Sequence, residues 1–272
     1  MKASELFDVN GLSVLVTGAA SGIGLGYAEV MADNGARVTL VDVDRDALQA
    51  AQERLRAEGA NVAVEVADVT KPDTLHAAVA AVLAREGRLD VLFANAGVSA
   101  GPGFLTGSGI RNEAAVLEHL SLETFDRAVS VNLRGALASL QAVVPTMKRQ
   151  GAGRIIVTTT VSLMQTETLV STLYVASKAA LGQLVRQAAL ELAKYGILVN
   201  GIAPGPTITG IGGGRLRDPA ARAPFEHTNP MHRLGTPQDV IGAALSLSSP
   251  ASRYITGTQI VIDGGGCLGS AD

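Results

Sequence analysis

The chain of 272 residues has no tryptophan, and its 4 tyrosines and 5 phenylalanines leave aromatic residues at 3% of the sequence. A platform that stacks sugars or single-stranded nucleic acid needs more aromatic side chains, so we expect none. The single cysteine, Cys267, excludes a disulfide framework and a metal site built from several thiolates. The 4 histidines show no ligand spacing, so we expect no catalytic metal.

Charge of one sign and long apolar runs are also missing. The 22 Lys and Arg residues are scattered among 25 Asp and Glu, for a net charge of −3, so we expect no nucleic-acid partner and no anionic membrane surface. No apolar run reaches the roughly 18 residues of a membrane span. The first residues lack the apolar segment of a signal peptide, and we expect a cytoplasmic protein.

Small aliphatic residues and glycine are abundant instead. Hydrophobic residues make up 47% of the chain and charged residues 17%, so it can bury a large core. Glycine occurs 31 times, which favours many tight turns. A core of Ala, Val, Leu and Ile with glycine turns is typical of a parallel sheet covered by helices.

Short β-branched runs alternate with longer Ala/Leu-rich stretches along the whole chain. Alternation of this kind predicts βαβ crossovers, and therefore an α/β fold with one doubly wound parallel sheet of about seven strands and helices on both faces. No linker interrupts the pattern, so we expect a single domain over residues 1–272. The expected strands are 13–17, 36–41, 61–67, 89–94, 154–159, 197–203 and 257–262, and the expected helices are 22–34, 44–57, 75–86, 121–150 and 173–195.

Two segments rich in glycine and proline break the alternation, at about 98–119 and 204–235. Each follows the carboxyl end of an expected strand, which is where open α/β sheets bind their ligands. Long irregular segments inside a compact domain are usually functional loops. We therefore expect both segments to surround a small-molecule substrate.

A glycine-rich turn, Thr17-Gly-Ala-Ala-Ser-Gly-Ile-Gly24, stands between the first strand and the first helix. Its glycines permit positive φ angles and a close approach to a pyrophosphate, and the helix that follows points free N–H groups at the same anion. A purely structural turn is the alternative. The position at the front of a βαβ series favours dinucleotide binding.

The second strand ends near Asp42, whose carboxylate suits the hydroxyls of an adenosine ribose and repels a 2′-phosphate. A loop acid or a helix cap is the plainer interpretation. Arg45 complicates the prediction, because a guanidinium there could hold a 2′-phosphate. We expect NAD, with NADP less favoured.

Tyr174 and Lys178 stand four residues apart and so share one face of the helix expected at 173–195. A free phenol, with a pKa of about 10, is a poor base at neutral pH, and a neighbouring cation lowers that value. The pair could therefore shuttle a proton, although isolated Tyr/Lys pairs of this spacing are common on helix surfaces.

Four motifs occur in one order, each after an expected strand: Thr17-Gly-x-x-x-Gly-x-Gly24, Asn95-Ala96-Gly97, Tyr174-x-x-x-Lys178 and Pro204-Gly205. In these motifs the sequence resembles the short-chain dehydrogenase/reductase family, from about Gly11 to Gly265. The resemblance implies a Rossmann-type fold, and an oxidoreductase that interconverts a secondary alcohol and its ketone by hydride transfer. It also implies a homo-oligomer, either a tetramer or a dimer.

The resemblance further implies roles for individual residues. Tyr174 would be the general acid/base, Lys178 would hold the nicotinamide ribose and lower the pKa of the phenol, and Asn132 would support a water between the lysine and solvent. The positions implied to bind the cofactor are Gly18, Ser21, Gly22, Ile23, Gly24, Asp42, Asp68, Val69, Asn95, Ala96, Gly97, Tyr174, Lys178, Pro204, Gly205, Thr207 and Thr209.

The chain departs from the family pattern at the serine that orients the substrate. The family spacing selects Val161, which has no hydroxyl. Strand register favours Thr160, and a shift in the other direction selects Ser162; either hydroxyl can donate to a carbonyl oxygen. Loss of this donor is a third possibility. The alternatives to an NAD-dependent enzyme are an NADP-dependent ketone or 3-oxoacyl reductase and a non-catalytic nucleotide-sensing protein of the same fold.

Overall fold

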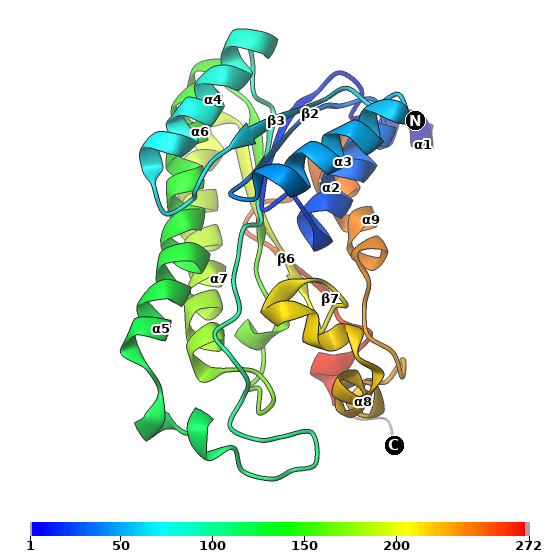
Figure 1. Ribbon diagram of the computed structural model, residues 1–272. Coiled ribbons are helices and arrows are strands. Elements are labelled where there is room, and N and C mark those ends of the chain that lie inside the picture. Colours follow the sequence, from blue (N-terminus) through cyan, green and yellow to red (C-terminus); the bar gives the residue numbers. More distant parts are fainter. Residues whose placement is uncertain (1, 270–272) are drawn as a thin grey trace.

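The structure is a computed structural model that describes residues 2–269, and one seven-stranded sheet runs through it (Figure 1). The strand order is β3-β2-β1-β4-β5-β6-β7, and every neighbouring pair is parallel. The predicted doubly wound sheet is confirmed. The strands are β1 Ser13–Thr17, β2 Arg37–Asp42, β3 Val62–Val66, β4 Val91–Ala94, β5 Gly153–Thr158, β6 Ile197–Pro204 and β7 Gln259–Ile262.

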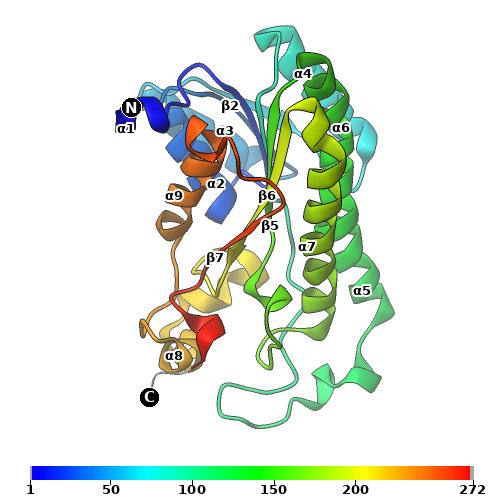
Figure 2. The same cartoon turned by 180° about the vertical axis from the view of Figure 1, so that it is seen from behind.

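Helices cover both faces of the sheet (Figures 1 and 2). On one face lie α2 Gly22–Asp33, α3 Arg45–Ala57 and α9 Pro237–Ser248. The other face carries α4 Pro72–Glu86, α6 Gly135–Gln150 and α7 Thr172–Leu192. Three shorter helices complete the fold: α1 Ala3–Leu6, α5 Leu122–Ala128 and α8 Pro219–Thr228.

The central strands are buried on both faces, which explains why they are continuous apolar runs and not alternating ones. All residues of β1 and of β4 are buried. Two hydrophobic clusters result, one beneath each layer of helices. The rings of Tyr27 and Phe93 stack in one of them, with their centroids 4.7 Å apart.

The order of the strands changes direction at β1. Strands β2 and β3 extend the sheet on one side of β1, and β4 to β7 extend it on the other. In open α/β sheets a crevice forms at this point, outside the carboxyl ends of the strands. Both irregular segments, 98–119 and 204–235, lie at this edge, at the bottom of Figure 1.

Two expected elements differ from the structure. The helix expected over 121–150 is divided into α5 and α6 by a π-helical stretch, Val129–Arg134, which the periodicity of apolar residues does not reveal. The irregular segment 204–235 contains α8, which Asp218 caps by accepting a hydrogen bond from the backbone N–H of Ala220. Pro219 is compatible with this helix because the first helical position needs no N–H.

No helix within residues 2–269 has the length and apolar character needed to span a membrane.

Candidate active site

The glycine-rich turn is folded so tightly that side chains could not replace its glycines. Gly18 and Gly22 have φ angles of +66° and +59°. A Cβ atom on Gly24 would lie 2.1 Å from the carbonyl oxygen of Gly18, and one on Gly18 would lie 2.8 Å from the Cα of Ala96. The turn is a bare backbone cradle at the N-terminus of α2, after the N-cap Ser21 and with Ile23 in the first helical turn. Such a cradle fits a pyrophosphate.

Asn95 fastens this cradle to the sheet. Its amide nitrogen Nδ2 donates to the carbonyl oxygens of Thr17 and Gly18, at 3.1 and 3.2 Å. Its Oδ1 accepts a hydrogen bond from the Thr158 hydroxyl at 3.0 Å. The backbone N–H groups of Asn95 and Ala96 donate to the Thr17 hydroxyl at 3.1 and 3.2 Å. The carboxyl ends of β1, β4 and β5 are thereby linked.

Asp42 faces the cradle from the end of β2. Its Oδ2 accepts a hydrogen bond from the backbone N–H of Ala20 at 3.1 Å, and its Oδ1 accepts from Val43 and Asp44 at 2.7 and 3.2 Å. The carboxylate is therefore held beside the glycine-rich turn, where it fits the ribose diol of a dinucleotide. Arg45 is the first residue of α3, close by in the chain.

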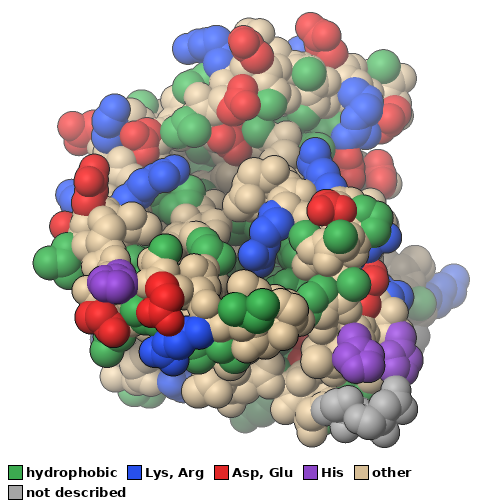
Figure 3. All heavy atoms as spheres, turned by 60° about the horizontal axis from the view of Figure 1, so that its bottom comes forward, with side chains coloured by type: hydrophobic (Ala, Val, Ile, Leu, Met, Phe, Trp, Pro, Cys, Tyr) green, Lys and Arg blue, Asp and Glu red, His purple; other side chains and the backbone are tan. Residues whose placement is uncertain are grey.

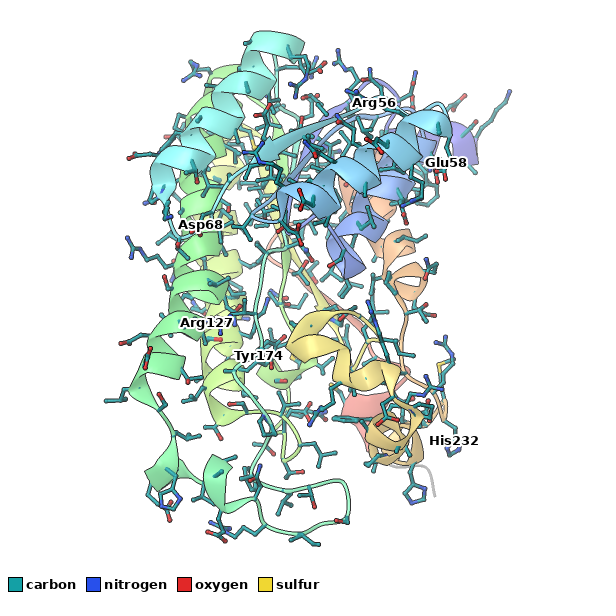
Figure 4. The ribbon with its side chains drawn as sticks, in the orientation of Figure 1. Arg56, Glu58, Asp68, Arg127, Tyr174 and His232 are labelled. Carbon is teal, nitrogen blue, oxygen red and sulfur yellow. The ribbon has the colours of Figure 1, made fainter. Side chains whose placement is uncertain are left out.

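Asp68 and Val69 follow β3. The carboxylate of Asp68 accepts hydrogen bonds from the hydroxyl and the backbone N–H of Thr70, and these bonds lower the pKa of Asp68. Val69 is buried against Gly135, where an added Cβ would lie 2.6 Å from the Val69 Cγ2. These contacts shape the end of β3, and Figure 4 shows Asp68 well separated from Tyr174.

Lys178 is buried one turn along α7 from Tyr174. Its Nζ donates to the carbonyl oxygen of Thr158 at 2.8 Å, and burial lowers the pKa of the ammonium to about 8. A Cβ on Gly97 would lie 3.3 Å from this Nζ and 3.2 Å from the Oδ1 of Asn132. Because Gly97 has no side chain, the lysine and the asparagine meet beside the end of β4.

Asn132 is completely buried in the π-helical stretch. Its Oδ1 accepts from the backbone N–H of Val98 at 2.8 Å, and its Nδ2 donates to the Val98 carbonyl and to the Ser177 hydroxyl, at 3.1 and 3.0 Å. The Ser177 hydroxyl in turn donates to the carbonyl oxygen of Tyr174 at 2.8 Å. Asn132 thus joins the start of the 98–119 segment to the first turns of α7.

Tyr174 is half-buried on the α7 side of the sheet, above the irregular segments (Figure 4). Burial raises the pKa of its phenol to about 12, and a hydrogen bond with the Thr160 side chain opposes part of the rise. The shift is opposite to the lowering that we expected from Lys178. The reason is that the burial of the phenol dominates, while the ammonium of Lys178 is directed at the Thr158 carbonyl.

Thr160 and Ser162 are both buried beyond the end of β5. Their hydroxyl oxygens lie 3.1 Å apart, and the Thr160 oxygen also accepts from the backbone N–H of Ser162 at 3.3 Å. Of the two, Thr160 is the residue whose side chain interacts with the Tyr174 phenol and lowers its pKa. Val161 turns an apolar side chain into the interior between them.

The segment after β6 closes over the glycine-rich turn. Beyond Pro204, the backbone at Gly205 approaches Asp263 so closely that an added Cβ would lie 2.7 Å from the Asp263 Cβ. The Thr207 hydroxyl donates to the Gly205 carbonyl at 2.9 Å. Thr209 packs against Gly22, where an added Cβ would lie 3.3 Å from the Cβ of Thr209. The predicted cofactor residues after β6 and those of the cradle therefore meet.

Thr158 and Ser177 also belong to this arrangement, although sequence reasoning overlooked both. Thr158 accepts the Lys178 bond through its backbone carbonyl, which leaves no signal in the identity of the residue, and its hydroxyl donates to Asn95. Ser177 could have been noticed because it immediately precedes Lys178 and lies one turn after Tyr174.

The comparisons with known proteins agree with this geometry. A family model described as enoyl-(acyl carrier protein) reductase matches residues 18–266. An L-rhamnose-1-dehydrogenase from Scheffersomyces stipitis is 32% identical over 265 residues, which cover 94% of this chain and 96% of that protein.

Two solved structures are similar over almost the whole chain. A 7α-hydroxysteroid dehydrogenase complexed with NADH and 7-oxo glycochenodeoxycholic acid has a TM-score of 0.86 at 30% identity, covering 100% of this chain and 99% of that one. A gluconate 5-dehydrogenase from Burkholderia cenocepacia J2315, in complex with NADP and tartrate, has a TM-score of 0.86 at 30% identity, covering 97% and 98%.

The parallel sheet has a glycine cradle at the point where the strand order changes direction, and a Tyr/Lys/Asn cluster lies at the same edge. This combination defines a dinucleotide-dependent oxidoreductase. The chain belongs to the short-chain dehydrogenase/reductase family. It is an NAD(P)-dependent oxidoreductase that acts on CH–OH groups or the corresponding ketones.

Proposed function

We propose that the protein interconverts a secondary alcohol and its ketone, with NAD as the favoured cofactor and Tyr174 as the general acid/base. The observation that carries this proposal is the interaction of the Thr160 side chain with the Tyr174 phenol, together with the buried Lys178 and Asn132. Phenol and hydroxyl converge there on one point, as polarisation and protonation of a carbonyl oxygen require.

Because its pKa is raised, the phenol of Tyr174 is protonated at neutral pH. In the reduction direction it donates that proton to the carbonyl oxygen, while the Thr160 hydroxyl orients the same oxygen. In the oxidation direction the phenol has to lose its proton first, and positive charge brought close to the phenol favours this loss. The nicotinamide supplies or accepts the hydride.

The cofactor is assigned to this chain's residues as follows. The pyrophosphate would lie on the Gly18–Gly24 cradle, the ribose diol on Asp42, and the adenine beside Asp68 and Val69. Lys178 would hold the nicotinamide ribose. Asn95, Ala96, Gly97, Pro204, Gly205, Thr207 and Thr209 would border the nicotinamide half.

The preference for NAD rests on Asp42, which three backbone N–H groups hold beside the cradle. A carboxylate at this place accepts hydrogen bonds from ribose hydroxyls and repels a phosphate on the ribose. The proximity of Arg45 along the chain favours the alternative, an NADP-dependent ketone or 3-oxoacyl reductase.

The experiment combines a cofactor titration with Tyr174→Phe. Purified protein is titrated with NADH and with NADPH, followed by fluorescence, and a panel of secondary alcohols and ketones is then screened through NADH absorbance. We expect tighter binding of NADH, and in the Tyr174→Phe variant a loss of turnover of at least about a thousandfold with nearly unchanged NADH affinity. Retained turnover in that variant would falsify the role of Tyr174. Cofactor binding with no turnover of any substrate would favour the non-catalytic alternative.

We also propose that residues 1–272 act as one domain in a cytoplasmic homo-oligomer, a tetramer or a dimer. Large apolar side chains exposed on the helices support an assembly, since Leu122 on α5 is 78% exposed and Leu190 on α7 is 80% exposed. Light scattering coupled to size-exclusion chromatography measures the assembly state, and a monomeric mass would contradict this expectation.

A further inference from the structure

A cavity of about 340 Å³ lies at the carboxyl edge of the sheet, between the 98–119 segment and α8. Three parts of the chain contribute to its wall: the segment after β4, the connection between β5 and α7, and the segment after β6. The lining residues are Pro102, Leu105, Thr106, Gly107, Ser108, Asn112, Leu169, Arg215, Ala220, Ala221, Pro224 and Phe225.

Close backbone contacts hold these walls together. A Cβ on Gly103 would lie 2.1 Å from the carbonyl oxygen of Thr168, and one on Gly107 would lie 2.2 Å from the Cγ of Pro224. The backbone of Gly103 also donates to the Leu169 carbonyl at 3.2 Å. The cavity is therefore built by specific contacts between segments that are distant in the sequence.

The segments that form these walls also contact residues of the candidate active site. The segment after β4 starts at Val98, whose backbone exchanges two hydrogen bonds with Asn132. Pro102 pairs with Val170, and Ser171 then caps α7, the helix that carries Tyr174. A substrate held at Tyr174 can extend its remote end along these walls into the cavity.

The lining combines apolar and polar side chains and carries a single charge among the described residues. Leu105, Leu169, Pro224 and Phe225 supply apolar surface, whereas Thr106, Ser108 and Asn112 supply hydroxyls and an amide. Arg215 alone is charged among the lining residues that the structure describes. Its guanidinium forms neither an ion pair nor a hydrogen bond within residues 2–269.

Two arginines that follow Arg215 in the chain are paired. Arg222 on α8 contacts Glu226 at 3.0 Å, and Arg233 contacts Asp239 at 2.7 Å. Figure 3, which brings this edge of the molecule forward, shows basic side chains scattered among acidic ones and not gathered in a patch. The positive charge at the cavity is thus local, and an unpaired guanidinium in such a place suits an anion with two oxygen acceptors.

We propose that the substrate is an amphipathic alcohol or ketone with an anionic group, a carboxylate or a phosphate, at its far end, and that Arg215 binds this group in the cavity. This proposal rests on the proposed function, because it places the reacting carbon at Tyr174. The apolar wall takes the body of the substrate, and the guanidinium selects its charged end.

The probes are linear methyl ketones with a spacer of about four to ten methylene groups, a range chosen to cross a cavity of this size. Each is made with a terminal carboxylate, a terminal phosphonate and a neutral carboxamide. Calorimetry measures binding to the protein in the presence of NADH, and the loss of NADH absorbance measures reduction.

At one spacer length we expect an anionic probe to bind about tenfold more tightly than the matching carboxamide, which is typical of a charge-assisted hydrogen bond. Arg215→Gln should remove that advantage and leave carboxamide binding within about twofold. Arg217→Gln is the matched control, because Arg217 lies two residues further along the chain but does not line the cavity. It should keep the advantage. The anion that binds more tightly identifies the group as carboxylate or phosphate.

Equal binding of the anionic and neutral probes at every length overturns the proposal, as does an advantage that survives Arg215→Gln. Failure of the proposed function has a different signature. An Arg215-dependent preference in binding without any reduction keeps the cavity assignment and overturns the reaction, whereas reduction without a preference keeps the reaction and overturns the assignment.

Discussion

The cofactor side and the substrate side of this crevice are built by different means. On the proposed cofactor side, backbone groups and glycines that tolerate no side chain form the cradle, as at Gly18 and Gly24. On the substrate side, side chains such as Leu105 and Arg215 line an open cavity between irregular segments. A backbone cradle accepts one chemical shape, whereas side chains can change without altering the fold. Changes should therefore abolish function on the first side and redirect it on the second.

Among the substitutions that test this comparison, Gly24→Ala should have the largest effect, because it breaks the cradle. The new Cβ would lie 2.1 Å from the Gly18 carbonyl oxygen, so the turn has to open. We expect NADH affinity to fall by at least about a hundredfold and the protein to lose on the order of 2 kcal/mol of stability. Fluorescence titration and thermal unfolding measure the two effects.

Gly242→Ala is the matched control for this substitution. Gly242 lies in α9 with no atom within 4 Å of an added Cβ, so alanine should leave binding unchanged and raise stability slightly. Equal behaviour of the two variants would contradict the backbone cradle.

Thr160→Ala tests which hydroxyl orients the substrate. Because Thr160 is the residue whose side chain interacts with the Tyr174 phenol, we expect kcat to fall about a hundredfold, while Ser162→Ala costs about tenfold or less. Thr160→Ser restores the hydroxyl and should recover most of the activity. Steady-state kinetics on one substrate decide the order, and a larger loss in Ser162→Ala would reverse our assignment.

Asp42→Ala addresses cofactor choice and should have a smaller effect. Without the carboxylate, the ribose hydroxyls lose an acceptor and a 2′-phosphate loses its repulsion, so the ratio of NADPH to NADH affinity should rise by about tenfold. Binding titrations with both cofactors provide the measurement. Asp44→Ala, which removes the cap of α3, is the control and should lower stability without moving the ratio. An unchanged ratio in Asp42→Ala argues against the carboxylate as the selector.

The smallest expected effect is a change in the free energy of unfolding when Lys178 is substituted. Its pKa is about 8 in the folded protein and 10.5 in an exposed lysine, so between these values the unfolded chain binds more protons. Stability therefore rises with pH through this window, and at pH 7 the buried ammonium costs free energy. Lys178→Met removes that cost but also the bond to Thr158, for a net gain of about 1 kcal/mol at neutral pH.

Urea unfolding at about pH 7 and about pH 10, across the window set by this pKa, measures the difference between the Lys178→Met variant and the parent. The gain should shrink at the higher pH. Lys148→Met, which removes an ammonium paired with Glu191 on the surface, is the control. A variant less stable than the parent at neutral pH would show that the hydrogen bond outweighs the burial of charge.

The sheet order and the cofactor cradle were within reach of the sequence, because both depend on local patterns. Alternating strands and helices predicted the doubly wound sheet, and Thr17–Gly24 predicted the turn that the structure shows. The π-helical stretch at Val129–Arg134 was not predictable in this way. It is associated with the buried amide of Asn132 and its bonds to Val98, a partner 34 residues away in the chain.

The substrate side shows the same limit. The sequence favoured Thr160 over Ser162 on strand register, and it is the fold that brings the Thr160 side chain to the phenol. Our prediction that the pKa of Tyr174 is lowered was wrong, because the spacing of residues along a helix does not show how deeply a side chain is buried. Four-residue spacing puts Lys178 near Tyr174, but the fold directs its ammonium to Thr158.

The sequence alone therefore determined the class of fold, the glycine-rich turn and the four-residue spacing of Tyr174 and Lys178, since these follow from periodicity, glycine spacing and residue type. Tertiary structure alone decided which hydroxyl meets the phenol, how burial shifts the pKa values, and that Arg215 lines a cavity with Leu105 and Leu169. These properties depend on distances between segments far apart in the chain, and no local pattern encodes such distances.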